Sequence, residues 1–279
     1  MMSAAVLCFS VLDSLSKYLS RYYAVPFLIW ARYAVHLVLM AVIFVPQRGA
    51  ALVQTSQPGP QILRSVLLVV TSLLFVSGLR YLPIAEATSI MFLTPLLMTA
   101  LSAPLLHEKV DLRDWVGVAI GFVGVLIVVR PSGALLTAAI LLPLGAVICN
   151  SLYQMMTRKM RAADSSTTTN FITGVVGTVV MSFALPFFGK TPTLIHGLMM
   201  VAMGAAAATG HALLIRAYRY AAPAVVGPFS YAQLLWASLL GYLVFREFPD
   251  PLTMFGMAVI VASGLFVTYH NLLGRRRQV

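Results

Sequence analysis

The chain has 279 residues, of which 60% are hydrophobic and only 10% are charged, whereas a soluble domain carries about 25% charged residues. A water-soluble globular protein is therefore excluded. The formal net charge is +11, but the basic residues are scattered through short loops and the C-terminal tail. We expect them to set membrane topology and expect no nucleic-acid partner.

Apolar runs of about 20 residues recur along the chain, and each can cross the roughly 30 Å hydrocarbon layer of a bilayer as a helix. The strand-type alternation of a membrane β-barrel is absent. The sequence therefore predicts an all-α polytopic membrane protein. Ten transmembrane helices are expected, roughly at residues 2–20, 25–46, 62–80, 84–106, 112–130, 133–157, 167–188, 193–215, 222–245 and 251–273.

The first of these helices carries Ser10, Asp13, Ser14 and Lys17 at a spacing that places them on one face. Polar residues within a bilayer are costly and usually face a protein interior or a cavity. Two interpretations are open. Asp13 and Lys17 form an ion pair that holds the outer end of the helix, or Asp13 meets the ammonium group of a substrate or takes a proton.

Five further helices carry polar or aromatic residues of the same kind. The sixth repeats the stripe with Asn150, Tyr153 and Gln154, and Pro95 predicts a kink in the fourth. We therefore expect helices one, three, four, six, eight and nine to line a central cavity. The predicted substrate-binding residues are Ser10, Asp13, Thr71, Phe75, Glu86, Ser89, Asn150, Tyr153, Gln154, His211, Tyr231, Gln233 and Trp236.

Alternative interpretations also stay open for the isolated residues His36, His211 and Trp236. His36 and His211 could relay protons or could be hydrogen-bonded packing residues. Trp236 lies too deep for an interfacial belt, but it could equally pack in the core. Arg32 also lies within a predicted helix.

The chain contains two copies of one unit. Arg80-Tyr81 returns as Arg219-Tyr220, Phe92 as Tyr231, Glu108 as Glu247 and Gly117 as Gly256, always at an offset of 139 residues (231 − 92). Such a fixed register indicates an internal repeat. We assign residues 1–131 to the first five-helix repeat and residues 132–279 to the second. Cys8 and Cys149 show that the first helices of the two halves also correspond.

The repeat also predicts the geometry of the two halves. The chain crosses the membrane five times between equivalent residues, and five is odd, so the halves must be inverted repeats. Inverted repeats are the common plan of secondary transporters. Twelve Lys and Arg residues fall on one side of the predicted helices and six on the other, which favours cytoplasmic termini. Glu108 and Glu247 then lie on opposite faces as helix-end or gate residues.

A family resemblance rests on Arg80-Tyr81-Leu82-Pro83-Ile84-Ala85-Glu86-Ala87, on Leu93-Thr94-Pro95-Leu96 and on His107-Glu108-Lys109. These segments resemble the EamA-domain branch of the drug/metabolite transporter superfamily. The second half departs from the pattern, because Leu234 stands in place of Pro95 and Phe248 in place of Lys109.

The resemblance implies a ten-helix carrier of small metabolites in the bacterial inner membrane. The chain looks most like amino-acid exporters, including aromatic amino-acid exporters of the YddG type. On that resemblance Phe75, Tyr153, Tyr231 and Trp236 would offer stacking surfaces. Asn150, Gln154 and Gln233 would bond the backbone of an amino acid.

We therefore expect an inner-membrane secondary transporter that exports amphipathic metabolites by alternating access, with aromatic amino acids favoured. A carrier for S-adenosylmethionine or cationic drugs is an open alternative, and a channel-like facilitator is an alternative of another class. Enzyme signatures and a P-loop are missing, so neither catalysis nor ATP-driven transport is expected.

We expect no cofactor and no metal, and interpret Cys8 and Cys149 as buried small hydrophobes. The expected partners are a small-molecule substrate and the lipid bilayer, and the expected state is a monomer or a weak dimer. Gly117, Gly121 and Gly124 lie on one side of the fifth helix, where they serve either packing within the chain or a dimer seam.

Overall fold

The computed structural model spans residues 1–279 and describes all of them except 107–111, 131–137, 161–163, 221–222 and 277–279. The described residues form helices and no strand. The helices are α1 (Met2–Leu19), α2 (Val25–Arg48), η1 (Gly49–Leu52), α3 (Pro58–Leu79), α4 (Ile84–Met91), α5 (Leu93–Leu106), α6 (Leu112–Val129), η2 (Ala138–Ile140), α7 (Leu141–Met160), α8 (Ser166–Ser182), α9 (Leu185–Phe188), α10 (Leu194–Tyr220), α11 (Pro223–Val226), η3 (Gly227–Tyr231), α12 (Ala232–Leu240), η4 (Gly241–Phe245) and α13 (Pro251–Arg276).

The predicted all-helical membrane protein is confirmed. Helix lies within each of the ten predicted ranges. Within the part of the chain that the structure describes, seven helical stretches are long and apolar enough to cross a membrane, and Trp115–Val129 and Pro251–Val267 are shorter apolar helices. Ten membrane crossings remain a prediction.

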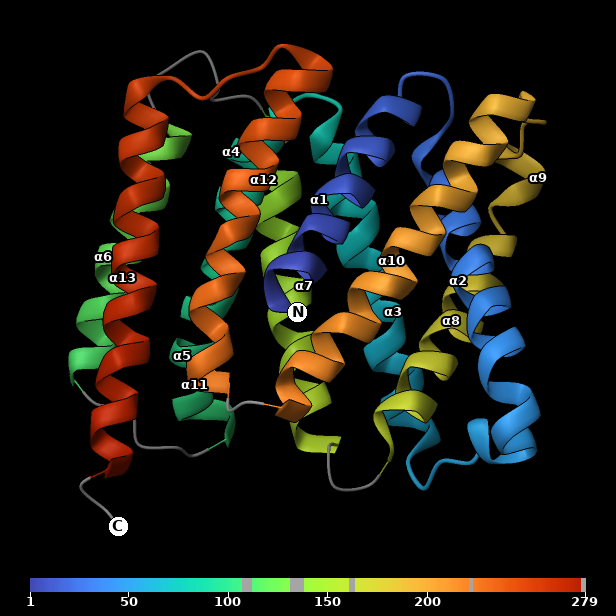
Figure 1. Ribbon diagram of the computed structural model, residues 1–279, viewed down its shortest axis with the longest axis horizontal. Coiled ribbons are helices and arrows are strands. Elements are labelled where there is room, and N and C mark those ends of the chain that lie inside the picture. Colours follow the sequence, from blue (N-terminus) through green and yellow to red (C-terminus); the bar gives the residue numbers. More distant parts are fainter. Residues whose placement is uncertain (107–111, 131–137, 161–163, 221–222, 277–279) are drawn as a thin grey trace.

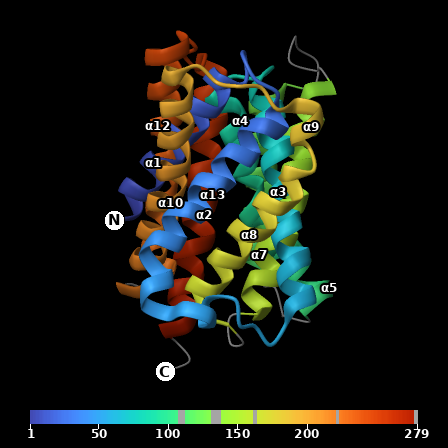
Figure 2. The same cartoon turned by 90° about the vertical axis from the view of Figure 1, so that its right-hand side faces the viewer.

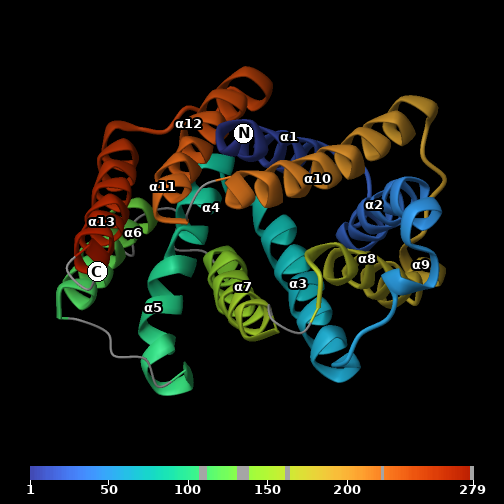
Figure 3. The same ribbon diagram turned by 60° about the horizontal axis from the view of Figure 1, so that its bottom comes forward.

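The helices form two facing layers that are joined at both ends (Figure 3). One layer contains α12, α1 and α10, and the other contains α5, α7 and α3. The α6–α13 pair joins the layers at one end of the molecule, and the α2–α8 pair joins them at the other (Figure 1). The view turned by 90° shows α2, α8 and α3 running side by side along that second end (Figure 2).

Two of the breaks within the predicted helices, one in 84–106 and one in 222–245, fall at equivalent positions. Between α4 and α5 the break lies at Phe92, because Pro95 has no N–H for the carbonyl of Met91 and its ring clashes with that carbonyl. The second break leaves a 3₁₀ turn ending at Tyr231 before α12 begins. The rings of Phe92 and Tyr231 stack with their centroids 5.0 Å apart. The two breaks therefore meet in the fold.

Helices α6 and α13 run antiparallel and make reciprocal contacts. A Cβ built on Gly117 would lie 2.2 Å from Val267 Cγ2, and one on Gly256 would lie 2.8 Å from Val128 Cγ2. These two pairs exchange under the 139-residue offset. Between them, Ser263 Oγ donates to the carbonyl of Gly117 at 2.6 Å. Residue numbers along α6 therefore increase as those of the contacted residues along α13 decrease, which is the pattern of an antiparallel pair.

The glycines of the fifth predicted helix take part in this same contact. Cβ atoms on Gly121 and Gly124 would approach Ser263 Oγ and Ile260 at 3.0 and 2.9 Å. The glycine face of α6 is thus covered by α13 of the same chain, which agrees with the alternative that these glycines serve packing within the chain.

Asp250 caps α13, and its removal tests the junction between α6 and α13. Asp250 Oδ1 accepts from the N–H groups of Leu252 and Thr253 at 2.9 and 3.0 Å, and Arg130 donates to the same oxygen. The Thr253 N–H, assisted by Arg130, holds the pKa of the Asp250 carboxyl below its ordinary value. Because the folded pKa is lowered, this stabilisation is present above pH 3.8 and is lost as the pH falls further.

We expect Asp250→Ala to lower stability by about 1 kcal/mol near neutral pH. The difference from the parent protein should shrink below pH 3.8. Thermal unfolding in detergent across a pH series measures both effects. Asp250→Asn keeps an accepting oxygen and should lose less. An Asp250→Ala protein with unchanged stability at pH 7 would contradict the capping role.

Candidate functional site

Lys17 ties three segments together at one end of the bundle. Its Nζ donates to Glu247 Oε2 at 2.5 Å and to the carbonyl of Leu82 at 3.0 Å, and it lies 5.0 Å from the centre of the Phe245 ring. Lys17 is therefore paired with Glu247, and the predicted Asp13–Lys17 pair is not formed. A side chain 230 residues away reaches Lys17 because α1 packs against α12.

Other charged groups gather at the same end. Glu86, in the first turn of α4, interacts electrostatically with Asp250, Arg130, Glu247 and Lys17. A cleft of about 580 Å³ opens beyond the Lys17–Glu247 pair and is lined by Arg21, Arg80 and Tyr81 among others. The structure thus places Glu86 among these end charges, and it places Glu247 at a helix end, one of the two positions that the sequence suggested for it.

Asp13 lies deep in α1, one turn away from Lys17. Its carboxylate is buried and accepts no hydrogen bond from the described residues, but it interacts electrostatically with Arg32 of α2. One turn earlier, Ser10 Oγ is fully buried and is also without a partner there. The polar stripe of α1 therefore carries hydrogen-bonding capacity that the described part of the protein does not use.

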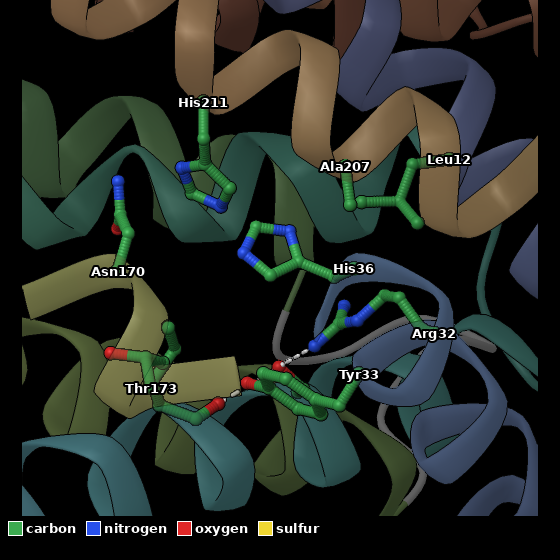
Figure 4. A pocket seen from close by; sticks show the side chains of 10 residues that line it. Leu12, Arg32, Tyr33, His36, Asn170, Thr173, Ala207 and His211 are labelled. Carbon is green, nitrogen blue, oxygen red and sulfur yellow. Dashed lines mark hydrogen bonds between the residues drawn. The ribbon is translucent and has the colours of Figure 1, made fainter. Parts of the chain in front are cut away.

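A pocket of about 90 Å³ lies next to this stripe, between α1, α2, α3, α8 and α10. We call it the histidine pocket. Its lining residues are Leu12, Arg32, Tyr33, His36, Leu68, Ser72, Asn170, Thr173, Ala207 and His211. His36 and His211 point toward one another across it (Figure 4), with ring centroids 6.2 Å apart and rings nearly perpendicular.

The polar groups of the histidine pocket are poorly satisfied by the protein. Arg32 donates to Ser72 Oγ and lies 4.8 Å from the centre of the Tyr33 ring. A guanidinium has five N–H donors, and Ser72 is its one acceptor among the described residues. The side chains of His36, Asn170 and His211, which also line the pocket, make no hydrogen bond within the described part of the chain. The pocket therefore presents mainly unused donors to whatever occupies it.

A second arginine, which is buried, lies behind the pocket wall. Arg64 is 1% exposed, and it donates to the carbonyl of Thr169 at 2.9 Å, to Thr157 Oγ1 at 3.2 Å and to Thr173 Oγ1. Its guanidinium lies 5.0 Å from the ring centre of Tyr153. All these partners are neutral, so the positive charge of Arg64 adds to that of Arg32 around Thr173, which lines the pocket.

The remaining predicted site residues are spread over the two layers. Asn150 Nδ2 donates to Thr94 Oγ1 at 3.3 Å, which links α7 to α5. Thr71 and Ser89 bond carbonyls four residues back in their own helices, and Phe75 packs against the largest buried apolar cluster. Trp236 packs on Met2, Val6, Ala217 and Val226, and its buried Nε1 has no partner in the described structure. Gln154 and Gln233 are half-buried.

The structure thus brings Asp13 and His211 to the histidine pocket and its neighbourhood. Phe92 and Tyr231 meet at the helix breaks, and Tyr153 lies beside Arg64. Sequence reasoning passed over Arg32, Asn170 and Thr173 as site residues. Arg32 and His36 are four residues apart and share a helix face, and an arginine in mid-helix is a strong polar signal within a bilayer. That signal could have found the pocket.

The model of the EamA-like transporter family matches the chain twice, over residues 1–130 and 137–269. Together the two matches cover most of the protein. The chain belongs to the EamA-like transporter family.

Curated relatives of this EamA-like protein span nearly all of it. An S-adenosylmethionine uptake transporter of Rickettsia bellii is 28% identical over 92% of this chain and 88% of its own length. A riboflavin transporter of Vibrio cholerae is 29% identical over 99% of this chain and 94% of its own. The chain is thus similar to transporters with two different substrates, and the resemblance to amino-acid exporters is not supported by these names.

One solved crystal structure has a TM-score of 0.66 to this EamA-like protein, at 19% identity and over 99% of both chains. This likeness concerns the fold alone. The family match shows that the protein is a multi-pass membrane transporter. Its family and named relatives are transporters and not enzymes.

Proposed function

We propose that the protein is a secondary transporter in which two inverted halves, residues 1–131 and 132–279, alternate a central site between the two sides of the inner membrane. The observation that carries this proposal is the reciprocal contact between α6 and α13. Equivalent helices that cross antiparallel, with exchangeable residue pairs, are what an inverted repeat requires.

The wider packing supports the same symmetry. Under the repeat, α1 corresponds to α7, α2 to α8, α3 to α10, and α4 with α5 to α12. The α1–α10 contact therefore corresponds to the α7–α3 contact, and the α1–α12 contact corresponds to the contacts of α7 with α4 and α5. The α2–α10 contact likewise corresponds to α8–α3. Phe92 stacks on its own equivalent, Tyr231, which puts the helix breaks near the symmetry axis. Discontinuous helices at a repeat interface are typical of transporter substrate sites.

The proposed orientation places both termini in the cytoplasm, because basic residues are more numerous in the loops on that side. The end held by Lys17 and Glu247 is then the outer end. In this arrangement the ion pair closes the outer side, and its rupture would accompany outward opening.

For the substrate we propose a metabolite with an α-amino-acid group, and first S-adenosylmethionine. The buried carboxylate of Asp13 and the guanidinium of Arg32 match an ammonium and a carboxylate, respectively. Four of the relatives named S-adenosylmethionine uptake transporters match over 92% or 93% of this chain. Aromatic amino acids share the same charged group, so they form the second candidate class. Riboflavin lacks both charges.

Flux into and out of vesicles tests the proposed function. Purified protein in liposomes is expected to equilibrate labelled S-adenosylmethionine at least tenfold faster than protein-free vesicles do. Adding label outside tests uptake, and diluting loaded vesicles tests export. Labelled phenylalanine, tryptophan and riboflavin form the comparison panel. Transport of riboflavin alone would overturn the amino-acid proposal, and no flux of any of the four would overturn the substrate class altogether.

A further inference from the structure

We propose that the histidine pocket is a binding site for a carboxylate group. The proposal rests on the donors and the charge that converge on this small pocket between α1, α2, α3, α8 and α10. It builds on the proposed function where the carboxylate belongs to the transported substrate, but the pocket could also take a free small carboxylate. The experiment below separates these two sources.

Hydrogen bonding is the first argument. Polar groups that face a pocket inside a membrane protein need a hydrogen-bond partner there, either from water or from a ligand. Arg32, His36, His211 and Asn170 all line the pocket, and Ser72 alone among the described residues accepts from Arg32. A carboxylate has two oxygens and about four acceptor sites. Such a group would satisfy Arg32 and its neighbours together, in the forked geometry that guanidinium groups favour.

Charge is the second argument. The charged groups around the pocket are Arg32 in its wall, Arg64 behind Thr173, and Asp13 on the α1 side. With both imidazoles counted as neutral, two positive charges face one negative charge. Among the described residues neither arginine is in an ion pair, because the two pairs there are Lys17–Glu247 and Arg130–Asp250. One monovalent anion would balance the site, and charges in a protein interior need such a partner.

Size is the third argument. A protein cavity of about 150 Å³ holds a benzene molecule, whereas the histidine pocket has about 90 Å³. The space admits a carboxylate with its first carbon atoms, but it excludes an adenine or isoalloxazine ring. The pocket is therefore suited to the charged end of a metabolite, and the ring system must lie outside it.

Carboxylate binding to the detergent-purified protein provides the first test. Sodium acetate and methionine should each raise the unfolding temperature of the protein above its value in sodium chloride at the same ionic strength. The increase should saturate with ligand concentration. Arg32→Gln should weaken the apparent affinity at least tenfold. Arg48→Gln removes an exposed arginine from the same helix and should leave the affinity unchanged. Should Arg32→Gln not fold, Asn170→Ala provides the second variant, with an expected loss of about fivefold.

Transport of two related cations provides the second test. Decarboxylated S-adenosylmethionine keeps the adenosyl, sulfonium and amino groups and lacks only the carboxylate. We expect its flux to be at least tenfold lower than that of S-adenosylmethionine, with the difference lost in Arg32→Gln. Arg32-dependent binding of both acetate and methionine without any flux of S-adenosylmethionine would sustain the pocket and overturn the proposed substrate. Equal flux of the two cations, with no Arg32-dependent carboxylate binding, would overturn the pocket and leave the transporter proposal standing.

Discussion

Gly256→Val is expected to destabilise the protein by about 3 kcal/mol, the upper end of the usual range for overpacking. A Cβ at this position would lie 2.8 Å from the carbonyl oxygen of Gly124 and 3.1 Å from the backbone nitrogen of Val128. Both neighbours are backbone atoms of α6, so no side-chain rotation can relieve the clash. The two helices would have to separate, and the reciprocal contacts between them would be lost together.

Two other glycines supply matched comparisons for this substitution. At Gly117, the repeat equivalent, the nearest atom is the end of the Val267 side chain. Gly117→Val should therefore cost less, because its clash is with a side chain and not with the backbone of a helix. At Gly197 a Cβ would meet nothing closer than Pro192 Cγ at 3.9 Å, so Gly197→Val should be nearly neutral. Thermal unfolding and size-exclusion profiles measure all three. A Gly256→Val protein as stable as Gly197→Val would show that the α6–α13 contact is not tight.

Local sequence rules were sufficient for much of the fold. The length and spacing of the apolar runs located helix in all ten ranges, because burial in a bilayer demands continuous backbone hydrogen bonding. Pro95 predicted the break near Phe92, since proline removes a donor from the helix. The match between Phe92 and Tyr231 could be read from the repeat, but their stacking could not. It depends on how the two halves pack.

Long-range partners explain what the sequence did not reveal. Asp13 is four residues from Lys17 and was the nearest partner that the sequence offered, yet Glu247 reaches Lys17 through the packing of α1 against α12. Arg64, at the start of the predicted helix 62–80, was counted among the twelve basic residues of the cytoplasmic side, but α3 begins at Pro58 and carries this residue into the interior. There α7 and α8 supply its acceptors. The histidine pocket combines five helices, and local sequence patterns do not reveal how those helices pack together.

Lys17→Met is expected to lower stability by about 2–3 kcal/mol, because a buried charge-assisted hydrogen bond is lost and Glu247 keeps an uncompensated charge. The Lys17 side chain is 6% exposed and that of Glu247 is 31% exposed, so solvent can screen only part of the effect. Combining Lys17→Met with Glu247→Met should cost less than the sum of the two single changes. Additive losses in this double-mutant cycle would contradict a direct coupling.

The same substitution should open the outer end of the bundle. Ser20 is 1% exposed beside Lys17, so a cysteine placed there reports access to this end in a protein whose Cys8 and Cys149 are replaced by serine. In Lys17→Met its reaction with a water-soluble maleimide should be about tenfold faster or more, since a loss of this size raises the population of locally open states. Arg21→Met removes a neighbouring cation that lies 5.2 Å from the same Phe245 ring without an ion pair among the described residues, and it should leave the rate nearly unchanged. If both variants react at the parental rate, the Lys17–Glu247 pair stabilises the helix ends but does not close them, and the alternating movement must depend on other contacts.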